Sequence, residues 1–482
     1  MEAFTVHGKS ARIIPIFVCG DNLAEHQLAG LFQCFNALKP CLKCLLPLVL
    51  YGECFAETDE LVRLRTAIGT EMQLVSIIES ESKKTQAAQL RKYGLNGVPS
   101  AILRIPPLAV NFPQNILQDP AHDFLEGVGE YSVKYLVQFA SKYGLTMDKL
   151  NAAIKEFNST FANRLEKYDG LPQPTFVQRS SEVYFRSTAS RTRTLISRMG
   201  IILHLAKLPT AFFSTNNWKC FSMAVQLCSF LFAPVVSDSD CDVLTAIVTK
   251  FLKLNVELYG KNSIRPKFHH LIHYPSAIRN FGPSKYHSTL GNERALGQLK
   301  SFVKSPNNPI NQIMQGVKFQ SLFFLFSLRP DYELEYTTVG TEQVLTSAIV
   351  DAIGFCPTNL INDMPEKARI FKQTIYRTCL FAPKLAICIN NPSHQSWMQN
   401  LPSFYYILLV FAPNSSSLFV LAQKMKTICY DRSYLGYKVL LQQEYVLLNC
   451  SDISVRLSFS IHKIGNVYVV LPDGLPYRCL LS

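Results

Sequence analysis

The spacing of apolar residues changes twice along this chain of 482 residues, and each change marks a different kind of structure. Residues 13–19 form an almost unbroken apolar run that stops at Gly20 and Asp21, which predicts a short buried strand. A helical spacing follows over residues 23–38, with apolar side chains on one face. The pattern then becomes weak and charged as far as residue 91.

From residue 119 to about residue 328 the apolar residues recur with the period of an amphipathic helix. The first predicted helix has Asp119 as its N-cap and Pro120 at its first position, and Gly144 closes it. A second helix is predicted over residues 146–157. Further helices are predicted at residues 193–207, 218–232, 242–259, 291–303 and 313–328. This part of the chain is therefore expected to be all-helical.

The last eighty or so residues have a different character. Aromatic and β-branched runs such as "FYYILLVFA" and "VYVVL" alternate with turn sequences such as "PNSSS" and "KIGN". This alternation predicts a small antiparallel β module, barrel-like, over residues 401–482. Residues 331–400 give a weak pattern interrupted by proline, and we interpret them as a linker.

The charge of the chain favours a polyanionic partner. Lysine and arginine outnumber aspartate and glutamate by 48 − 35 = 13, so the formal net charge is +13. Such a field suits nucleic acid, although it also serves plain solubility. One run without acidic residues, at 186–198, contains Arg186, Arg191, Arg193 and Arg198. It is either a stripe that grips phosphates or a solvated helix face.

We find no segment suited to a membrane or to export. The longest apolar candidate, residues 223–236, is too short to span a bilayer and contains Pro234. The 14 cysteines stand mostly in apolar contexts, which is typical of reduced core residues in an intracellular protein. No membrane partner is therefore expected.

Four residues have the spacing of a metal site. Cys41 and Cys44 are separated by two residues, and His273 follows either His269 or His270 by four or three positions, which places a histidine pair on one helix face. Two thiolates and two imidazoles complete a tetrahedral set without an open position, so the ion would be structural zinc. The alternative for the histidines is ordinary packing with backbone hydrogen bonds.

Three acidic positions stand at predicted element ends. Asp21 follows a strand and precedes a helix, where it is either a metal ligand or an N-cap. Glu293 lies near the start of a helix, where the helix dipole favours a carboxylate in any case. Asp119, His122 and the acids that follow them crowd one helix start, which taken alone favours a well-capped helix.

The order of these features resembles the transposases of the EnSpm/CACTA group over nearly the whole chain. The similar segments, in place and order, are "GDNLAEHQLAG", "CLKC", "DPAHDFLEGVGEY", "RPKFHHLIHYPSAIRNFGP" and "NERALGQLKSFV". The pair "ER" followed by "LK", Glu293-Arg294 and Leu299-Lys300, is similar to plant CACTA elements. The C-terminal "YDRSYLGYKV" resembles the same region of animal EnSpm-type proteins.

The resemblance implies a ribonuclease-H-like DDE core interrupted by a helical insertion, as in the V(D)J recombinase and the hAT transposases. Such cores hold two Mg²⁺ or Mn²⁺ ions and transfer DNA strands by in-line phosphoryl transfer. Carried over, Asp21 and Glu293 are the catalytic metal ligands. Zinc would be held by Cys41, Cys44, His269 (alternatively His270) and His273. Asp119 and His122 form a turn that is characteristic of the family, and the sequence does not indicate its role. The arginines of residues 186–198, with Arg294 and Lys300, are the DNA contacts we expect.

The same resemblance divides the chain into segments. Residues 1–60 would hold the second part of the core, 61–118 a connection, 119–285 the helical insertion, and 286–330 the glutamate helix with the helix after it. The linker and the β module follow.

Two departures from the family bear on activity. The family's first aspartate lies upstream of the Gly20-Asp21 strand, and the chain begins only a short way before that strand, so we expect little or no strand transfer. "RAL" follows Glu293, whereas animal relatives often have Lys-His shortly after the glutamate.

Two functional classes remain. One is a nuclear transposase that acts on the double-stranded DNA of transposon ends, with a homodimer expected from the resemblance. The other is a non-catalytic DNA- or chromatin-binding protein that keeps the scaffold and the basic surface.

Overall fold

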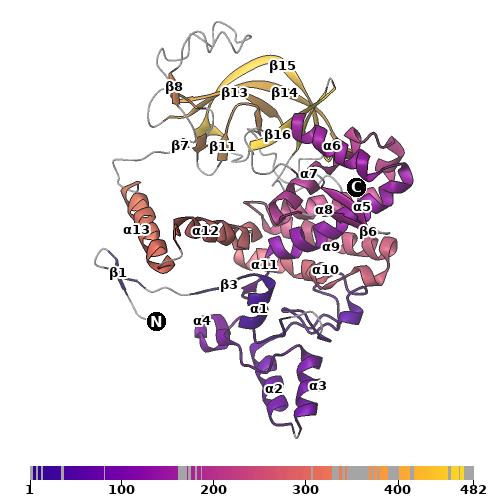
Figure 1. The fold of residues 1–482 in the computed structure, drawn as a ribbon, viewed down its shortest axis with the longest axis vertical. Helices are drawn as coiled ribbons and strands as arrows, with labels where there is room; N and C mark the ends of the chain where they lie inside the picture. The colour runs from indigo at the N-terminus through magenta and orange to yellow at the C-terminus, as the bar shows by residue number, and fades with distance from the viewer. Residues whose placement is uncertain are drawn as a thin grey trace.

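The protein has three parts in the computed structural model: a small N-terminal region, a helical block and a C-terminal barrel (Figure 1). The barrel lies at one end, the N-terminal region at the other, and the helical block between them. The structure describes residues 4–6, 9–11, 15–33, 37–80, 82–160, 171, 175–179, 182–185, 187–305, 308–327, 336–338, 342–344, 369–371, 374–376, 379–388, 401–412, 417–453, 458–465 and 467–471.

The N-terminal region contains one parallel strand pair and several helices. β3 (Val18–Cys19) pairs in parallel with β4 (Ile116–Leu117), and α1 (Asn22–Leu28) follows β3 directly. Two further helices, α2 (Ala67–Ile78) and α3 (Lys83–Tyr93), lie at the far end of the molecule. The remaining elements are the antiparallel pair β1 (Phe4–Val6) and β2 (Lys9–Ala11), and α4 (Pro106–Ala109).

The predicted helix over residues 23–38 is wrong in length, because α1 ends at Leu28. Gly30 adopts a positive φ of 73°, and a Cβ there would lie 2.6 Å from the carbonyl oxygen of Val98. Leu31 then forms an isolated bridge with Leu95. The helix ends here because the backbone of residue 98 comes close to Gly30, whose positive φ is not helical. The described apolar residues beyond it therefore belong to a loop.

The helical block follows the predicted pattern closely. A π-helical turn (Ala121–Val128) leads into α5 (Gly129–Ala140), and Gly144 closes this segment with a φ of 82°. The other helices are α6 (Met147–Thr160), α7 (Ala189–Leu205), α8 (Asn216–Leu231), α9 (Asp238–Tyr259), α10 (Pro266–His270) and α11 (Tyr274–Phe281). A hairpin of β5 (Phe176–Arg179) and β6 (Glu182–Phe185) interrupts them. From Trp218 onward α8 is buried along most of its length and forms the centre of the core.

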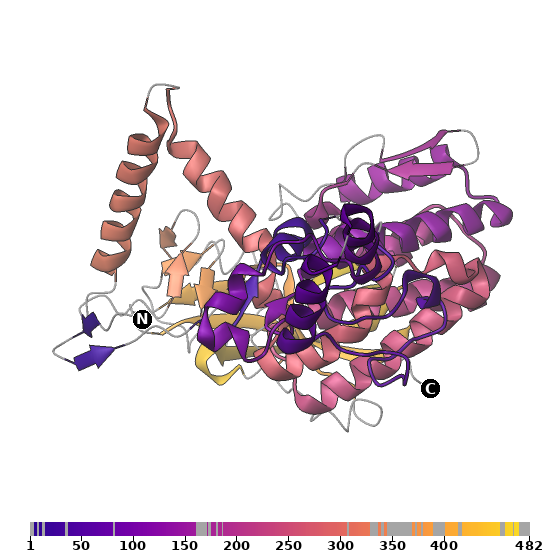
Figure 2. The ribbon, with the colours of Figure 1, turned by 90° about the horizontal axis from the view of Figure 1, so that it is seen from below.

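Two helices leave the block as an arm. α12 (Thr289–Phe302) and α13 (Pro309–Ser327) form a V that projects from the body (Figure 2). The Gln312 side chain closes the V: its amide oxygen accepts hydrogen bonds from the backbone nitrogens of Lys304 and Ser305, at 2.7 and 3.2 Å. Gly316 lets the Phe302 ring approach α13.

The C-terminal strands form a closed antiparallel ring. β12 (Leu385–Cys388) pairs with both β16 (Ser458–Ile464) and β13 (Phe404–Ala412), so the order β12-β16-β17-β15-β14-β13 returns to β12. The remaining members are β14 (Phe419–Asp431), β15 (Gly436–Asn449) and β17 (Val467–Leu471). β9 (Arg369–Phe371) and β8 (Glu342–Val344) extend the sheet beyond β13.

The β14–β15 turn fixes the barrel to the helical block. Trp218 donates its indole N–H to the carbonyl oxygen of Arg432 at 3.0 Å, and a ring nitrogen of His204 lies 2.9 Å from the Ser433 hydroxyl. Gly200 allows this approach, because a Cβ at that position would lie 2.7 Å from the Ser433 carbonyl oxygen. The two parts therefore pack directly on each other.

The helical block and the antiparallel C-terminal module confirm the coarse fold prediction. The ribonuclease-H-like core stays a prediction, because the described N-terminal residues supply a single parallel pair of two-residue strands. Residues 331–400, interpreted as a linker, contribute β7 (Tyr336–Thr338), β8, β9, β10 (Thr374–Tyr376), β11 (Cys379–Phe381) and β12. None of the described helices combines the length and the apolar character needed to cross a membrane.

Candidate metal centre and the adjoining acidic edge

Four predicted ligands come together in the core. The ligand atoms of Cys41, Cys44, His269 and His273 all lie within 4.8 Å of one another. The cysteines stand in the loop after α1, whereas His269 belongs to α10 and His273 ends the 3₁₀ turn that continues it. Each side chain is at most 1% exposed. Within the described part of the chain, this is the one group of such residues that converges so closely.

The distances fit a tetrahedral ion. The Cys44 Sγ–His269 Nε2 distance is 3.2 Å and the Cys41 Sγ–His273 Nε2 distance is 3.5 Å. Ligands about 2.0–2.3 Å from a zinc ion in a tetrahedron lie roughly 3.3–3.8 Å from one another. Two sulfurs and two imidazole nitrogens are also the donor set that zinc prefers. The cluster can therefore hold a metal ion such as zinc, and with four protein ligands the site is of the structural type.

The loop that carries the cysteines is held by buried cations. The Arg65 guanidinium donates to the carbonyl oxygens of Cys41, Lys39 and Tyr93 at 2.8–2.9 Å. The Lys43 ammonium, which is 1% exposed, donates to three carbonyl oxygens at residues 113, 114 and 116. The Lys43 bonds tie the cysteine loop to the segment that leads into β4, the strand before Asp119.

The surroundings of the two thiols shift their pKa values in opposite directions. Burial opposes ionisation of Cys41, but the hydrogen bond from Cys44 and the nearby His273 and His269 imidazoles hold its pKa well below the usual range. The same hydrogen bond, together with burial, raises the pKa of Cys44 well above its usual value. A bound divalent ion would remove the Cys44 proton, because its charge stabilises the second thiolate.

Sequence reasoning missed the residues around the ligands. His273 Nδ1 lies 2.6 Å from Glu57 Oε1, an arrangement that orients a metal-bound imidazole, and the His269 ring stacks on Tyr51 at 3.9 Å. No local spacing links Glu57 to His273, since the two are 216 positions apart. Cys41 and Cys44 could be found because they share a short motif.

His270, the alternative ligand, points elsewhere. Its Nδ1 lies 2.9 Å from Asp123 Oδ1, and Asp123 also accepts from the Tyr274 hydroxyl and the Asn22 amide, each at 3.1 Å. Burial opposes protonation of His270, but the Asp123 carboxylate raises its pKa above the ordinary value. His269 is therefore the histidine of the metal cluster, while His270 links α10 to the π-helical turn and to α1.

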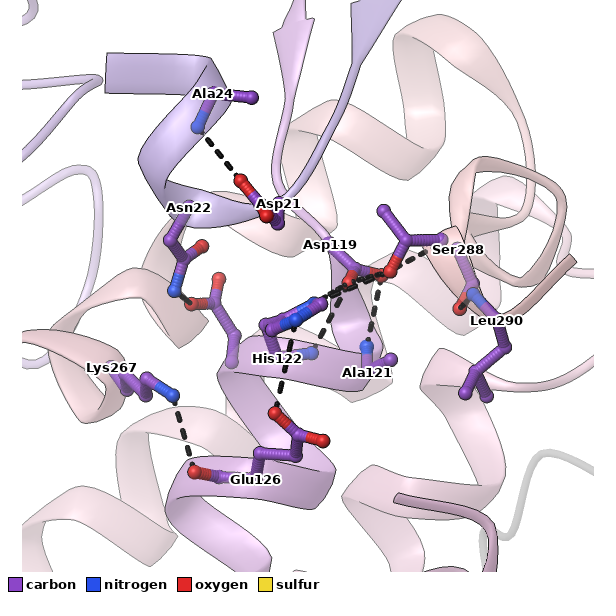
Figure 3. A network of polar contacts seen from close by, with 12 residues as sticks. Asp21, Asn22, Ala24, Asp119, Ala121, His122, Glu126, Lys267, Ser288 and Leu290 are labelled. Carbon is purple, nitrogen blue, oxygen red and sulfur yellow. Dashed lines mark hydrogen bonds and ion pairs between the residues drawn. The ribbon is translucent and has the colours of Figure 1, made fainter. Parts of the chain in front are cut away.

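Asp21 stands beside Asp119 at the carboxyl edge of the β3–β4 pair, which we call the acidic edge. Each aspartate follows the last residue of its strand by two positions, and the strands are parallel and in register. Figure 3 shows Asp21, at the start of α1, next to the turn that carries Asp119 and His122. Asp21 is exposed and caps α1 by accepting from the Ala24 N–H at 2.7 Å. The N-cap alternative is thus realised, and it engages one of the two carboxylate oxygens.

Asp119 is buried and serves as a junction. Its carboxylate accepts from the N–H groups of Ala121, His122 and Thr289, from the His122 ring and from the Thr289 hydroxyl. Burial works against ionisation, but these bonds lower the pKa of Asp119 and the bond to Asp119 raises the pKa of His122. Because Thr289 begins α12, the Asp119–His122 turn holds the start of that helix against the strand edge.

The other predicted site residues have mixed positions. Arg198 is 7% exposed and donates to Ser460 of the barrel at 3.0 Å, and Arg193 lies over the Phe232 ring at 5.0 Å. Arg191 is half-buried, and Lys300 is exposed on α12. Arg186 and the side chains of Glu293 and Arg294 lie outside the described residues. A small cavity of about 240 Å³ beside Asp21 is lined by Asn22, His26, His122 and Lys267 among others.

Comparison with known proteins gives no assignment: no family model matches the chain, and no curated protein matches it significantly.

Proposed function

We propose that this chain is a zinc-stabilised DNA-binding protein of the EnSpm/CACTA transposase type, in which the acidic edge after β3 and β4 supports metal-dependent strand cleavage and transfer. The observation that carries the proposal is the meeting of three elements. Asp21 and Asp119 each follow one of two paired parallel strands by two residues. The first residue of α12, Thr289, donates its backbone N–H to the Asp119 carboxylate, and α12 contains Glu293. Glu293 follows Thr289 by four residues, about 6 Å of helix rise.

Each residue of the edge has a distinct part in the proposed chemistry. Asp21 and Glu293 would hold Mg²⁺ or Mn²⁺, which when bound activates water or a 3′-hydroxyl and stabilises the leaving oxygen. Asp119 and His122 would act as positioning residues, because their bonds to Thr289 set where α12 begins. The zinc cluster would keep α10, and with it Lys267 of the small cavity, next to the loop after α1.

A second candidate is a non-catalytic DNA- or chromatin-binding protein. One observation favours it: the Asp119 carboxylate is engaged in five hydrogen bonds and is fully buried, so Asp21 is the exposed acid of the two at this edge. Glu25, a buried acid on α1 four residues after Asp21, has its pKa raised well above the usual range by burial and by Asp123, which favours a neutral side chain. The net charge of +13 would then serve binding alone.

A plasmid-nicking assay separates the two candidates. Supercoiled DNA is incubated with Mn²⁺ or Mg²⁺ and with the full chain, Asp21→Asn or Glu293→Gln, and DNA binding is measured in parallel by gel shift. The matched control is Glu71→Gln, an exposed acid on α2. Metal-dependent nicking that survives Glu71→Gln but not the other two substitutions supports the transposase. Binding without nicking supports the second candidate, and a chain that does not bind DNA contradicts both.

A further inference from the structure

A second cavity lies between α8, α9 and the β14–β15 turn. Its volume is about 840 Å³, within the range of pockets that enclose small organic ligands. It shares no lining residue with the metal cluster or with the acidic edge. On the side of the turn, the Trp218 indole N–H donates to the Arg432 carbonyl oxygen at 3.0 Å, which holds the turn against α8.

The lining combines an apolar wall with a cationic rim. Phe213, Met223, Ile247 and Leu254 supply apolar surface, and Ser222 and Thr215 supply hydroxyl groups. The rim carries three exposed lysines from two helices: Lys219, Lys250 and Lys253. Among the described residues none of these three ammonium groups has an ion-pair partner.

The acids of the lining do not cancel this charge. Asp431 is paired with Lys438 and also accepts from Ser433, which leaves Glu257 as the remaining carboxylate of the lining against the three lysines. Lys250 and Lys253 stand about one turn apart on α9, and Lys219 lines the same cavity from α8. The mouth of the cavity therefore presents converging positive charge.

A buried amide inside the cavity lacks an acceptor. Gln226 lines the cavity and is 2% exposed, and its Nε2 has no hydrogen-bond partner among the described residues. A buried donor without an acceptor is costly, and native proteins keep few of them. Gln226 lies two turns along α8 from Lys219, on the same face. A ligand oxygen beside Gln226 would satisfy this donor.

We propose that this cavity is a binding site for a small organic anion with an apolar, ring-sized body. The apolar wall would take the body of the ligand, the three lysines would hold its carboxylate, sulfonate or phosphate group, and Gln226 would donate to one of its oxygens. Size, charge and the unpaired donor each point to the same class of ligand. An uncharged apolar ligand would leave the rim unused, and a simple inorganic anion would leave the wall exposed.

Two fluorescent probes test this assignment on the full chain. The probe 8-anilinonaphthalene-1-sulfonate has an aromatic body and one negative charge, and N-phenyl-1-naphthylamine has the same rings without the charge. The chain has two tryptophans, so a Trp397→Phe background leaves Trp218, which lines the cavity, as the energy donor. We expect one saturable sulfonate site with energy transfer from Trp218, and binding of the neutral probe about ten-fold weaker.

Substitutions separate this site from non-specific adsorption. Lys250→Gln combined with Lys253→Gln is expected to weaken sulfonate binding by about three- to ten-fold without affecting the neutral probe. The matched control is Lys83→Gln with Lys84→Gln, which changes two exposed lysines of α3. It should leave the binding of both probes unchanged. Gln226→Met should weaken sulfonate binding while raising the urea midpoint of unfolding, since it removes an unsatisfied buried donor.

The opposite results would overturn the proposal. They are equal affinity for both probes, several unsaturable probe molecules per chain, or sulfonate binding that is indifferent to the α9 lysines. Displacement of the sulfonate probe by duplex DNA would also overturn it, because the rim would then be part of a DNA surface. Sulfonate binding that Gln226→Met leaves unchanged would overturn it as well, because the buried amide would then not contact the ligand.

Discussion

Single carboxylates carry much of the long-range organisation of this protein. Asp119 and Asp123 are four residues apart on one turn, yet Asp119 reaches Thr289 of α12 and Asp123 reaches His270 of α10 and Tyr274 of α11. Both are buried, so their bonds act in a medium that screens them poorly. Two side chains thus connect one turn to segments about 150 to 170 positions away.

Thr289→Val tests the connection between Asp119 and α12. The substitution keeps the side-chain shape and removes the hydroxyl that bonds to a buried carboxylate, so we expect the free energy of unfolding to fall by about 1–3 kcal/mol. Urea unfolding measures the change, and hydrogen exchange should show faster exchange at the start of α12. Thr245→Val, which removes a hydroxyl bonded within α9, is the control. Equal effects of the two substitutions would mean that the Asp119 junction does not hold α12.

At the level of elements, the zinc-type cluster joins a loop that has little regular structure of its own to α10. The loop between α1 and α2 contains Cys41 and Cys44, and it is otherwise held by Arg65 and Lys43 bonds to backbone carbonyls. A metal ion held by ligands from both sides of this contact would add to the stability of the folded state, because the unfolded chain does not assemble the site.

Cys44→Ser should remove the ion and loosen this contact. We expect the purified chain to contain one zinc ion and the variant to contain none. The free energy of unfolding of the variant should be lower by about 3 kcal/mol or more, since a structural site contributes its binding energy to folding. Elemental analysis and urea unfolding with and without a chelator provide the measurements. Cys54→Ser changes a buried thiol outside the cluster and should keep the ion. A chain that is metal-free, and no less stable with the chelator, would rule out a structural zinc.

The sequence predicts elements best where one pattern governs a whole segment. The run at residues 404–412 matches β13, and the predicted 218–232 and 242–259 helices correspond to α8 and α9 within a few residues. The sequence does not predict α2, because this helix exposes Ile68, Met72 and Val75, which blurs the amphipathic pattern. It does not predict α3 either, because that helix has no fully buried residue to mark an inner face. The ligand pairs could be found from short motifs, whereas Glu57 and Thr289 act across distances along the chain that no local spacing reveals.

At the scale of the whole molecule, the α12–α13 arm both projects from the body and carries positive charge. Between Glu293 and Asp331 the sequence contains five basic residues and no acid. Lys300, Lys304 and Lys318 are exposed on this arm, which projects from the body next to the helix start tied to Asp119 (Figure 2). Exposed apolar residues, including Met314 at 52%, lie on the same arm. If DNA binds at the acidic edge, this arm offers it a basic surface that begins at the same edge.

If the arm contacts DNA, its lysines should account for a definite share of the salt dependence of DNA binding. Each phosphate contact contributes about 0.9 to the slope of log affinity against log salt for duplex DNA, so changing Lys300, Lys304 and Lys318 to glutamine should reduce the slope by about 2–3. Filter binding or anisotropy at several salt concentrations measures the slope. The same number of exposed lysines removed elsewhere, at Lys83, Lys84 and Lys155, lowers the net charge equally and should leave the slope nearly unchanged. If both triple variants lowered the slope alike, binding would depend on total charge, and the arm would have no special place in it.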